Sequence, residues 1–167
     1  SGLYAAVKAI RPTVSVGISP AGDIEKNREE LYADAARWGG EEGYVDYLMP
    51  QLYYGFENSA SPFEKTARQW ANLIRCDSVK LYAGLAIYKS GEEDQYAGPE
   101  SDQKQGPRYE WINHSDIISR QVAWGRKTQP YAGFALYSYQ YSFGDSRSKQ
   151  LQKEWNALSA LLENKEK

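Results

Sequence analysis

Residues 44–58 of the sequence, YVDYLMPQLYYGFEN, decide the fold because a buried strand and a group of polar and aromatic side chains follow directly on one another. The first half has the composition of a core strand, whereas the second half contains side chains that form hydrogen bonds or stack. Side chains alternate between the two faces of a strand, so those of Tyr47, Met49, Gln51 and Tyr53 share one face. We interpret the stretch as a strand that leaves a core and enters a pocket.

Four segments of this kind alternate with helical patterns along the chain. Such alternation predicts an α/β fold with a parallel sheet and right-handed crossovers. Ser61, with Glu64 three residues later, and Ser115 are the predicted N-caps of the second and third helices that follow strands. The predicted strands are residues 14–20, 44–54, 80–88 and 131–139, and the predicted helices between and after them are residues 25–38, 62–74, 115–127 and 146–162.

The two faces of the predicted strands differ in a way that favours the wall of a barrel. In the third strand, aliphatic side chains alternate with Tyr82, Gly84 and Tyr88, and the first and fourth strands show a similar contrast. A doubly wound sheet is aliphatic on both faces, whereas a barrel has helices only on its outside. Four strands cannot close a (β/α)8 barrel, which needs about 200 residues or more. The sequence thus predicts one domain over residues 1–167, the four-stranded C-terminal half of a TIM (β/α)8 barrel with a long loop at residues 90–113. A small open α/β sandwich is the alternative.

Composition and charge exclude several classes of function. The chain has 20 Lys and Arg against 22 Asp and Glu, unlike the basic stripe of a nucleic-acid-binding protein. No apolar run is long enough to span a bilayer, and residues 1–12 resemble a short amphipathic helix rather than a signal peptide. A lone cysteine forms no disulfide within the chain, and a lone histidine makes a histidine-rich metal site impossible. We therefore expect no cofactor, no metal, no nucleic-acid partner and no membrane span.

Six segments of the chain carry a resemblance to a known family: VSVGISPAGD (14–23), YADAARW (32–38), YVDYLMPQLYYGFEN (44–58), KLYAGLAIYKSG (80–91), RQVAWGR (120–126) and YAGFALYSY (131–139). Together they resemble the family-10-like glycosyl hydrolases, a family of predicted bacterial (β/α)8 enzymes. They follow one another in family order and correspond to the second half of the family barrel. The resemblance implies that the chain hydrolyses O-glycosyl bonds in, or binds, bacterial cell-wall glycan or another polysaccharide. It also implies export to the cell envelope or the extracellular space. The family's fourth-strand segment, with its paired aspartates, has no counterpart here, so we expect this chain alone to lack turnover.

Glycoside hydrolysis uses two carboxylates, an acid and a base or nucleophile, about 5–10 Å apart. Asp23 and Glu57 each follow a predicted strand end by a few residues, which makes them the candidate catalytic pair. The alternative is that both are solvated loop carboxylates. Asp46 lies earlier in its strand, where a structural hydrogen bond is the better interpretation, and Asp34 is expected to orient a helix or loop. Glu110 is expected either to close over a ligand or to lie at the surface.

Six residues at or near the predicted strand ends are candidates for binding a carbohydrate substrate. There an amide can hold sugar hydroxyls and a tyrosine ring can stack on a sugar. The alternatives are packing of the rings inside the barrel and extension of the lysine side chain to solvent. The candidates are Ser19, Gln51, Tyr53, Tyr88, Lys89 and Tyr139.

A half-barrel leaves two edge strands, residues 14–20 and 131–139, and an uncovered inner face. We expect a homodimer or a complementing N-terminal half-barrel to cover them. The alternative is a monomer in which the loop at residues 90–113 folds into the trough. Three functions stay open at this point: a glycosidase half-barrel, a non-catalytic carbohydrate-binding remnant, and a fragment whose role is to oligomerise.

Overall fold

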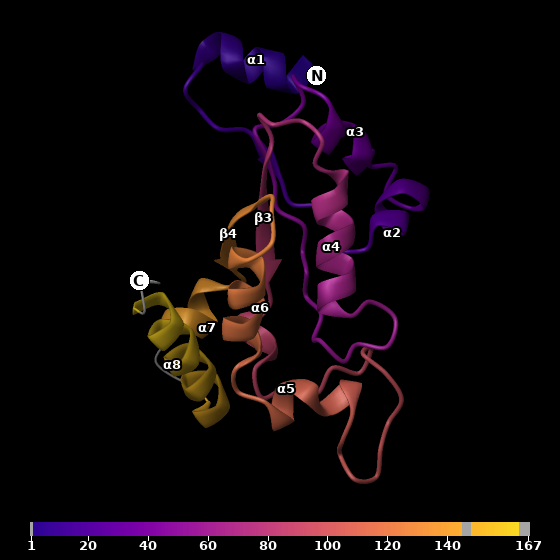
Figure 1. Ribbon diagram of the computed structural model, residues 1–167, viewed down its shortest axis with the longest axis vertical. Helices are drawn as coiled ribbons and strands as arrows, with labels where there is room; N and C mark the ends of the chain where they lie inside the picture. The colour runs from indigo at the N-terminus through magenta and orange to yellow at the C-terminus, as the bar shows by residue number, and fades with distance from the viewer. Residues whose placement is uncertain (1, 145–147, 164–167) are drawn as a thin grey trace.

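A computed structural model describes residues 2–144 and 148–163 of the chain. The sheet consists of β1 (Gly17–Ile18), β2 (Tyr47–Leu48), β3 (Lys80–Leu85) and β4 (Tyr131–Leu136). Its strands lie in the order β1-β2-β3-β4, and every neighbouring pair is parallel. Helices are interleaved between the strands, as Figure 1 shows. The predicted α/β class is confirmed, and the arrangement is that of one half of a TIM barrel.

The predicted helices are present, with three departures from the prediction. A helix at Glu110–Asn113 lies in the predicted loop 90–113, and one at Tyr139–Phe143 begins at the last residue of the predicted fourth strand. Residues 25–38 form two helices rather than one, because Tyr32 has a positive φ of 52° and Asp34 caps a new helix by accepting a hydrogen bond from the N–H of Arg37 (3.1 Å). The start of the predicted helix 146–162 lies outside the described residues. The described helices are α1 (Gly2–Ile10), α2 (Ile24–Glu29), α3 (Ala35–Gly40), α4 (Phe63–Leu73), α5 (Glu110–Asn113), α6 (Ile117–Arg126), α7 (Tyr139–Phe143) and α8 (Lys149–Glu163), with 3-10 turns at Ile87–Lys89 and Pro107–Tyr109.

The strands β1 and β2 are shorter than predicted, and a proline follows each of them. The N–H of Met49 donates to the carbonyl of Ile18 (2.9 Å), and the N–H of Gln51 donates to that of Pro20 (2.9 Å), so these bonds continue past β2. Pro20 and Pro50 themselves have no N–H to donate to a neighbouring strand. Beyond β2, Gln51 forms only isolated bridges, with Ala21 and Gly84. The chain therefore leaves the sheet gradually, which places residues 51–54 at its C-terminal edge.

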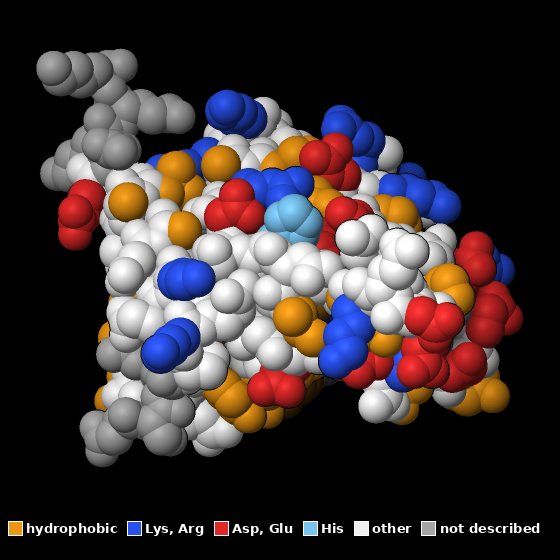
Figure 2. Space-filling view, turned by 90° about the horizontal axis from the view of Figure 1, so that it is seen from below, with side chains coloured by type: hydrophobic (Ala, Val, Ile, Leu, Met, Phe, Trp, Pro, Cys, Tyr) orange, Lys and Arg blue, Asp and Glu red, His pale blue; other side chains and the backbone are white. Residues whose placement is uncertain are grey.

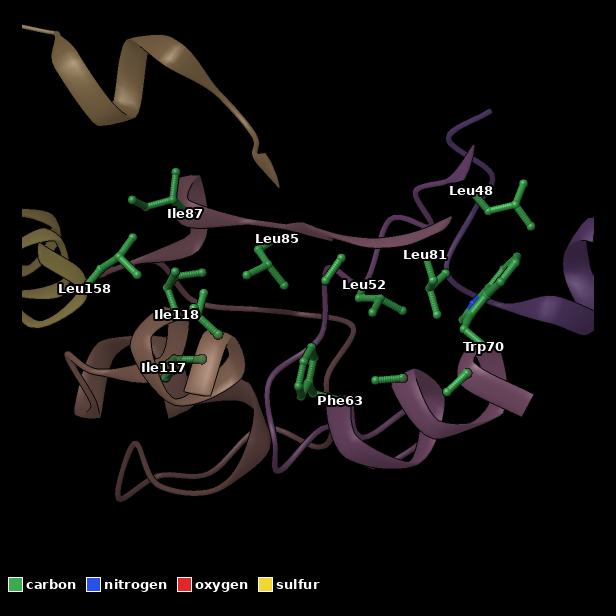
Figure 3. Close-up of a cluster of buried hydrophobic side chains, with 14 of the residues drawn as sticks. Leu48, Leu52, Phe63, Trp70, Leu81, Leu85, Ile87, Ile117, Ile118 and Leu158 are labelled. Carbon is green, nitrogen blue, oxygen red and sulfur yellow. The ribbon is translucent and has the colours of Figure 1, made fainter. Parts of the chain in front are cut away.

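One face of the sheet packs against helices and holds the core. Leu48, Leu81 and Leu85 are fully buried there, together with Phe63 and Trp70 of α4. Figure 3 shows these side chains between the sheet and helices α4 and α6. Burying a side chain of this size contributes about 1.5–3 kcal/mol. The tryptophans of the helices belong to this core, since Trp70 is buried and Trp38, Trp124 and Trp155 are partly buried against the same cluster.

The other face of the sheet carries tyrosine rings packed on glycines. A Cβ atom at Gly17 would lie 2.1 Å from the ring of Tyr47, and one at Gly133 would lie 3.2 Å from the ring of Tyr82. Each glycine pairs directly with its tyrosine on the neighbouring strand. The rings of Tyr47 and Tyr82 meet edge to face, with centroids 5.5 Å apart. At Gly17 any side chain would overlap the Tyr47 ring, and at Gly133 the Tyr82 ring would have to shift by a few tenths of an ångström, so contacts across the strands constrain the sequence of this face.

Both serine caps predicted for the helices are wrong. Before α4, the side-chain oxygen of Asn58 accepts from the N–H groups of Ala60 (3.1 Å) and Ser61 (2.8 Å), the N–H of Phe63 donates to the backbone carbonyl of Gly55 (2.9 Å), and Ser61 forms no cap. At the start of α6, the N–H of Ile118 donates to Oε1 of Glu154, which belongs to α8 (2.6 Å). A long-range contact thus replaces the local cap predicted at Ser115.

Glu154 is fully buried, and its Oε2 has no hydrogen-bond partner among the described residues. Burial raises the pKa of its carboxyl group to about 7, although the N–H groups of Ile118 and Ile117 act in the opposite direction. The folded chain therefore favours the protonated carboxyl more than the unfolded chain does. The resulting stabilisation is complete below the unfolded pKa of about 4.3 and is lost as the pH rises through about 7.

We predict that Glu154→Gln flattens the pH dependence of stability. In the unmodified chain the free energy of unfolding should fall by up to about 3 kcal/mol between pH 5 and pH 8 through this group. Urea denaturation at several pH values measures the effect. Glu163→Gln, at an exposed position of the same helix, is the control and should keep the original slope. An equal slope in both variants would contradict the assignment.

Candidate functional site

The C-terminal ends of the strands open on a cavity of about 420 Å³, which we call the mouth. In Figure 1 the arrow of β3 points toward this end of the molecule, where α5 lies, and Figure 2 views the molecule from there. Four of the predicted site residues line the mouth, and so does Asp94, which no sequence pattern had singled out. The four are Asp23, Gln51, Tyr53 and Lys89.

Tyr53, Tyr88 and Tyr137 form a ring cluster at the edge of the mouth. The rings of Tyr53 and Tyr137 are stacked at 5.9 Å, and Tyr88 meets each of them edge to face at 6.0 Å. Burial raises the pKa of the Tyr53 and Tyr88 hydroxyls above the usual value for tyrosine, and nearby Tyr and Asp groups add to the rise. Both hydroxyls therefore stay protonated at neutral pH and can donate hydrogen bonds.

Gln51 connects the first two strands at the mouth. Its Nε2 donates to the carbonyl of Ser19 at 3.3 Å, which leaves its Oε1 and its second N–H available. Ser19 thus contributes a backbone carbonyl here, and its own side chain is exposed. The predicted binding residue Tyr139 lies on α7, exposed and packed on Phe143, with centroids 5.1 Å apart.

Lys89 and Asp94 form a half-enclosed ion pair between the mouth and a second cavity of about 390 Å³. Nζ of Lys89 lies 2.6 Å from Oδ2 of Asp94 and donates to the carbonyl of Tyr53 at 2.8 Å. Asp94 is only 6% exposed. The ammonium group therefore connects the loop at residues 90–106 to Tyr53, in the segment that follows β2. Its third N–H remains for a ligand.

The two candidate catalytic carboxylates lie in different surroundings. Asp23 lines the mouth and caps α2, accepting a hydrogen bond from the N–H of Lys26 at 2.9 Å. Glu57 does not line the mouth, and its Oε1 lies 3.9 Å from Nε2 of His114. Figure 2 shows this histidine, in pale blue, at the surface beside acidic side chains. The catalytic role of both residues stays a prediction.

Glu110, expected at the surface or over a ligand, is buried beneath the loop that follows β2. Its carboxylate accepts hydrogen bonds from the N–H groups of Phe56 (2.8 Å) and Glu57 (3.0 Å). Burial raises the pKa of Glu110, and these two N–H groups oppose that rise. A Cβ atom at Gly55 would lie within contact distance of the carboxylate, so only glycine fits there. Gly55 and the Glu110 carboxylate together fix the path of the chain as it leaves the mouth.

The remaining carboxylates of the sequence analysis behave as expected. Asp46 forms structural bonds at the opposite end of the sheet, accepting from the Tyr4 hydroxyl (2.9 Å) and the Val16 N–H (2.6 Å) and pairing with Lys8 (2.8 Å). Burial alone would raise the pKa of Asp46, but these partners hold it below its usual value. Asp34 caps α3. Among the described residues, no three His, Cys, Asp or Glu side chains gather closely enough to hold a metal ion.

A parallel βα wall whose strand ends open on a cavity with tyrosine, amide and carboxylate side chains is consistent in architecture with one half of a (β/α)8 barrel. The sequence profile of the glycosyl hydrolase-like 10 family matches residues 1–99, and the chain belongs to that family. The segments at 120–126 and 131–139 lie beyond that match. Within residues 2–144 and 148–163, no helix is both long and apolar enough to cross a bilayer.

Curated relatives carry names that agree with the family. The chain is 38% identical over 101 residues to glycosyl hydrolase DigH of Escherichia coli K12, covering 52% of this chain and 23% of that protein. It is 34% identical over 98 residues to glycosyl hydrolase YngK of Bacillus subtilis 168, covering 50% of this chain and 19% of that protein. The matched part thus spans less than a quarter of either relative. No solved structure gives a significant match.

We predict that Gly55→Ala destabilises the chain by about 1–3 kcal/mol, because the added methyl group displaces the Glu110 carboxylate from its two N–H donors. Urea unfolding measures the loss. Gly125→Ala is the matched control, since a Cβ atom there meets nothing within 4 Å and alanine favours the helix. Equal stability of the two variants would contradict this account of the loop.

Proposed function

We propose that the chain is the glycan-binding wall of a glycosyl hydrolase barrel and that a polysaccharide segment occupies the mouth. One observation carries the proposal: the Tyr53–Tyr88–Tyr137 rings, the Gln51 amide and the Lys89 ammonium converge at the C-terminal end of one parallel sheet. In barrel enzymes that end holds the active site. Rings supply stacking surfaces for sugars, and the amide and ammonium supply donors for hydroxyl groups.

We further propose that bacterial cell-wall glycan is the substrate class and that the chain acts outside the cytoplasm. The membership in a glycosyl hydrolase-like family and the names of the relatives support action on a glycan. Fractionation of cells that produce the full-length protein tests the location. Recovery from the envelope or the medium supports the proposal, and recovery from the cytoplasm alone contradicts it.

We predict that Gln51→Ala and Tyr53→Ala each weaken binding of the chain to the N-acetylglucosamine hexamer by about tenfold, the effect of losing about 1.4 kcal/mol of contact. Isothermal titration calorimetry measures the affinity. Tyr32→Ala is the control, because this ring is 90% exposed between α2 and α3. An equal loss of affinity in all three variants, or no loss in either mouth variant, would contradict the proposal.

Hydrolysis needs a positioned acid and a second carboxylate, and the two carboxylates that line the mouth are both engaged. Asp23 caps α2, and Asp94 pairs with Lys89. We therefore propose that this chain alone binds glycan without cleaving it. The release of reducing ends from peptidoglycan should not exceed that of a buffer blank. Clear hydrolysis that is abolished by Asp23→Asn or Glu57→Gln would overturn this proposal and would assign the catalytic pair.

We also propose that the inner face is covered in the functional molecule, by a second copy or by a complementing half-barrel. The strands β1 and β4 lie at the edges of the sheet, and the inner side chain of Tyr137 is 58% exposed. Unpaired edges and exposed rings favour association. Light scattering at micromolar concentration should show a dimer of the isolated chain. A monodisperse monomer that unfolds cooperatively would rule out the obligate dimer.

A further inference from the structure

A groove of about 700 Å³ lies between α4 and α6, on the helical side of the sheet. It is lined by Phe56, by Arg120 of α6 and by residues from Pro62 along α4 to Asn72, and it does not include the mouth residues Gln51 or Tyr53. Nothing derived above uses this groove, which we call the outer groove.

Two arginines that line the outer groove lie over aromatic rings, of which Phe56 lines the groove itself. The guanidinium carbon of Arg120 lies 4.3 Å from the ring centroid of Phe56, and that of Arg68 lies 5.5 Å from the ring of Trp124. Phe63 joins the two rings, with centroid distances of 5.3 Å and 5.7 Å. A guanidinium that stacks by its face still presents its N–H edge to a ligand, with part of the ordering cost already met.

The charge of the outer groove is opposite to that of the chain. Lys65, Arg68 and Arg120 line it against one carboxylate, Glu64, while the chain as a whole has a net charge of −2. Neither Lys65 nor Arg68 forms an ion pair with any carboxylate that the structure describes. Arg120 lies 3.8 Å from Asp116 and also interacts electrostatically with the Glu110 carboxylate. Figure 2 shows Lys and Arg side chains beside hydrophobic groups along one border of the molecule. The groove is therefore suited to a ligand with more than one negative group.

Shared lining residues connect the outer groove to the mouth. A hollow of about 160 Å³ between α2 and α4 shares Lys65 and Gln69 with the groove. The same hollow shares Asp23 and Ser61 with the mouth. A polymer held at the mouth can therefore continue over the start of α4, past Asp23 and Glu25 of the hollow, and reach the arginines.

We propose that the outer groove binds the acidic groups of an anionic polysaccharide whose chain extends from the mouth. The inference rests on the proposed glycan binding and adds the ligand class, a polymer with carboxylate or phosphate groups. Arg68 and Arg120 each bind one acidic group in a bidentate manner, and Lys65 adds a point charge at the border with the intervening hollow. Neutral glycan binds at the mouth alone.

The test compares three soluble probes in titrations at 50 mM and 300 mM NaCl: an oligogalacturonate, a phosphorylated dextran and unmodified dextran. Arg68→Gln with Arg120→Gln should weaken binding of at least one charged probe by about tenfold or more at low salt, because charge-assisted bidentate bonds are lost. The loss should shrink at high salt. Which charged probe responds identifies carboxylate or phosphate as the ligand group. Binding of unmodified dextran should not change.

Two further variants keep the result interpretable. Arg11→Gln with Arg28→Gln removes two exposed arginines that lie outside the groove and should leave all probes unaffected. Arg68→Lys with Arg120→Lys keeps the charge but loses the planar fork, and it should retain only part of the affinity. Equal effects of the groove and control variants would overturn the proposal. The proposed function fails separately, if Tyr53→Ala leaves the binding of every probe unchanged.

Discussion

The difference between the two faces of the sheet is the constraint on which the rest of the molecule depends. On one face, leucine side chains pack against α4 and α6, and on the other, the rings of Tyr47 and Tyr82 rest on Gly17 and Gly133. The helices pack on the aliphatic face because burying apolar side chains between helix and sheet stabilises the fold. The same contrast leaves the inner face free for a ligand, a second copy or another half-barrel.

The mouth is held together by contacts between backbone and side chain rather than by a loop rich in glycine. Lys89 joins the carbonyl of Tyr53 to Asp94, Gln51 reaches the carbonyl of Ser19, and Glu110 fixes the two residues after Gly55. Each of these bonds bridges segments that are distant in the sequence or ties a loop to a strand end. The tyrosine rings therefore project from a framework that is ordered before any ligand arrives, which lowers the entropic cost of binding.

The parallel sheet and the mouth could be predicted from the sequence because both depend on a local pattern. Alternation of large and small side chains marked the strands, and the polar end of residues 44–58 marked the pocket. Glu110 and Glu154 could not be predicted, since each carboxylate receives its N–H donors from a segment at least 36 residues away. Asp94 lies among several acidic residues of a long loop, and nothing in that loop distinguishes the one that meets Lys89.

The central claim, that the C-terminal strand ends form a glycan-binding mouth, is tested most directly by backbone amide NMR of the isotope-labelled chain with the N-acetylglucosamine hexamer. The account predicts shifts concentrated at residues 51–54, 88–94 and 137, with the opposite end of the sheet around Asp46 unaffected. Shifts confined to that opposite end, or no shifts at millimolar hexamer, would contradict it.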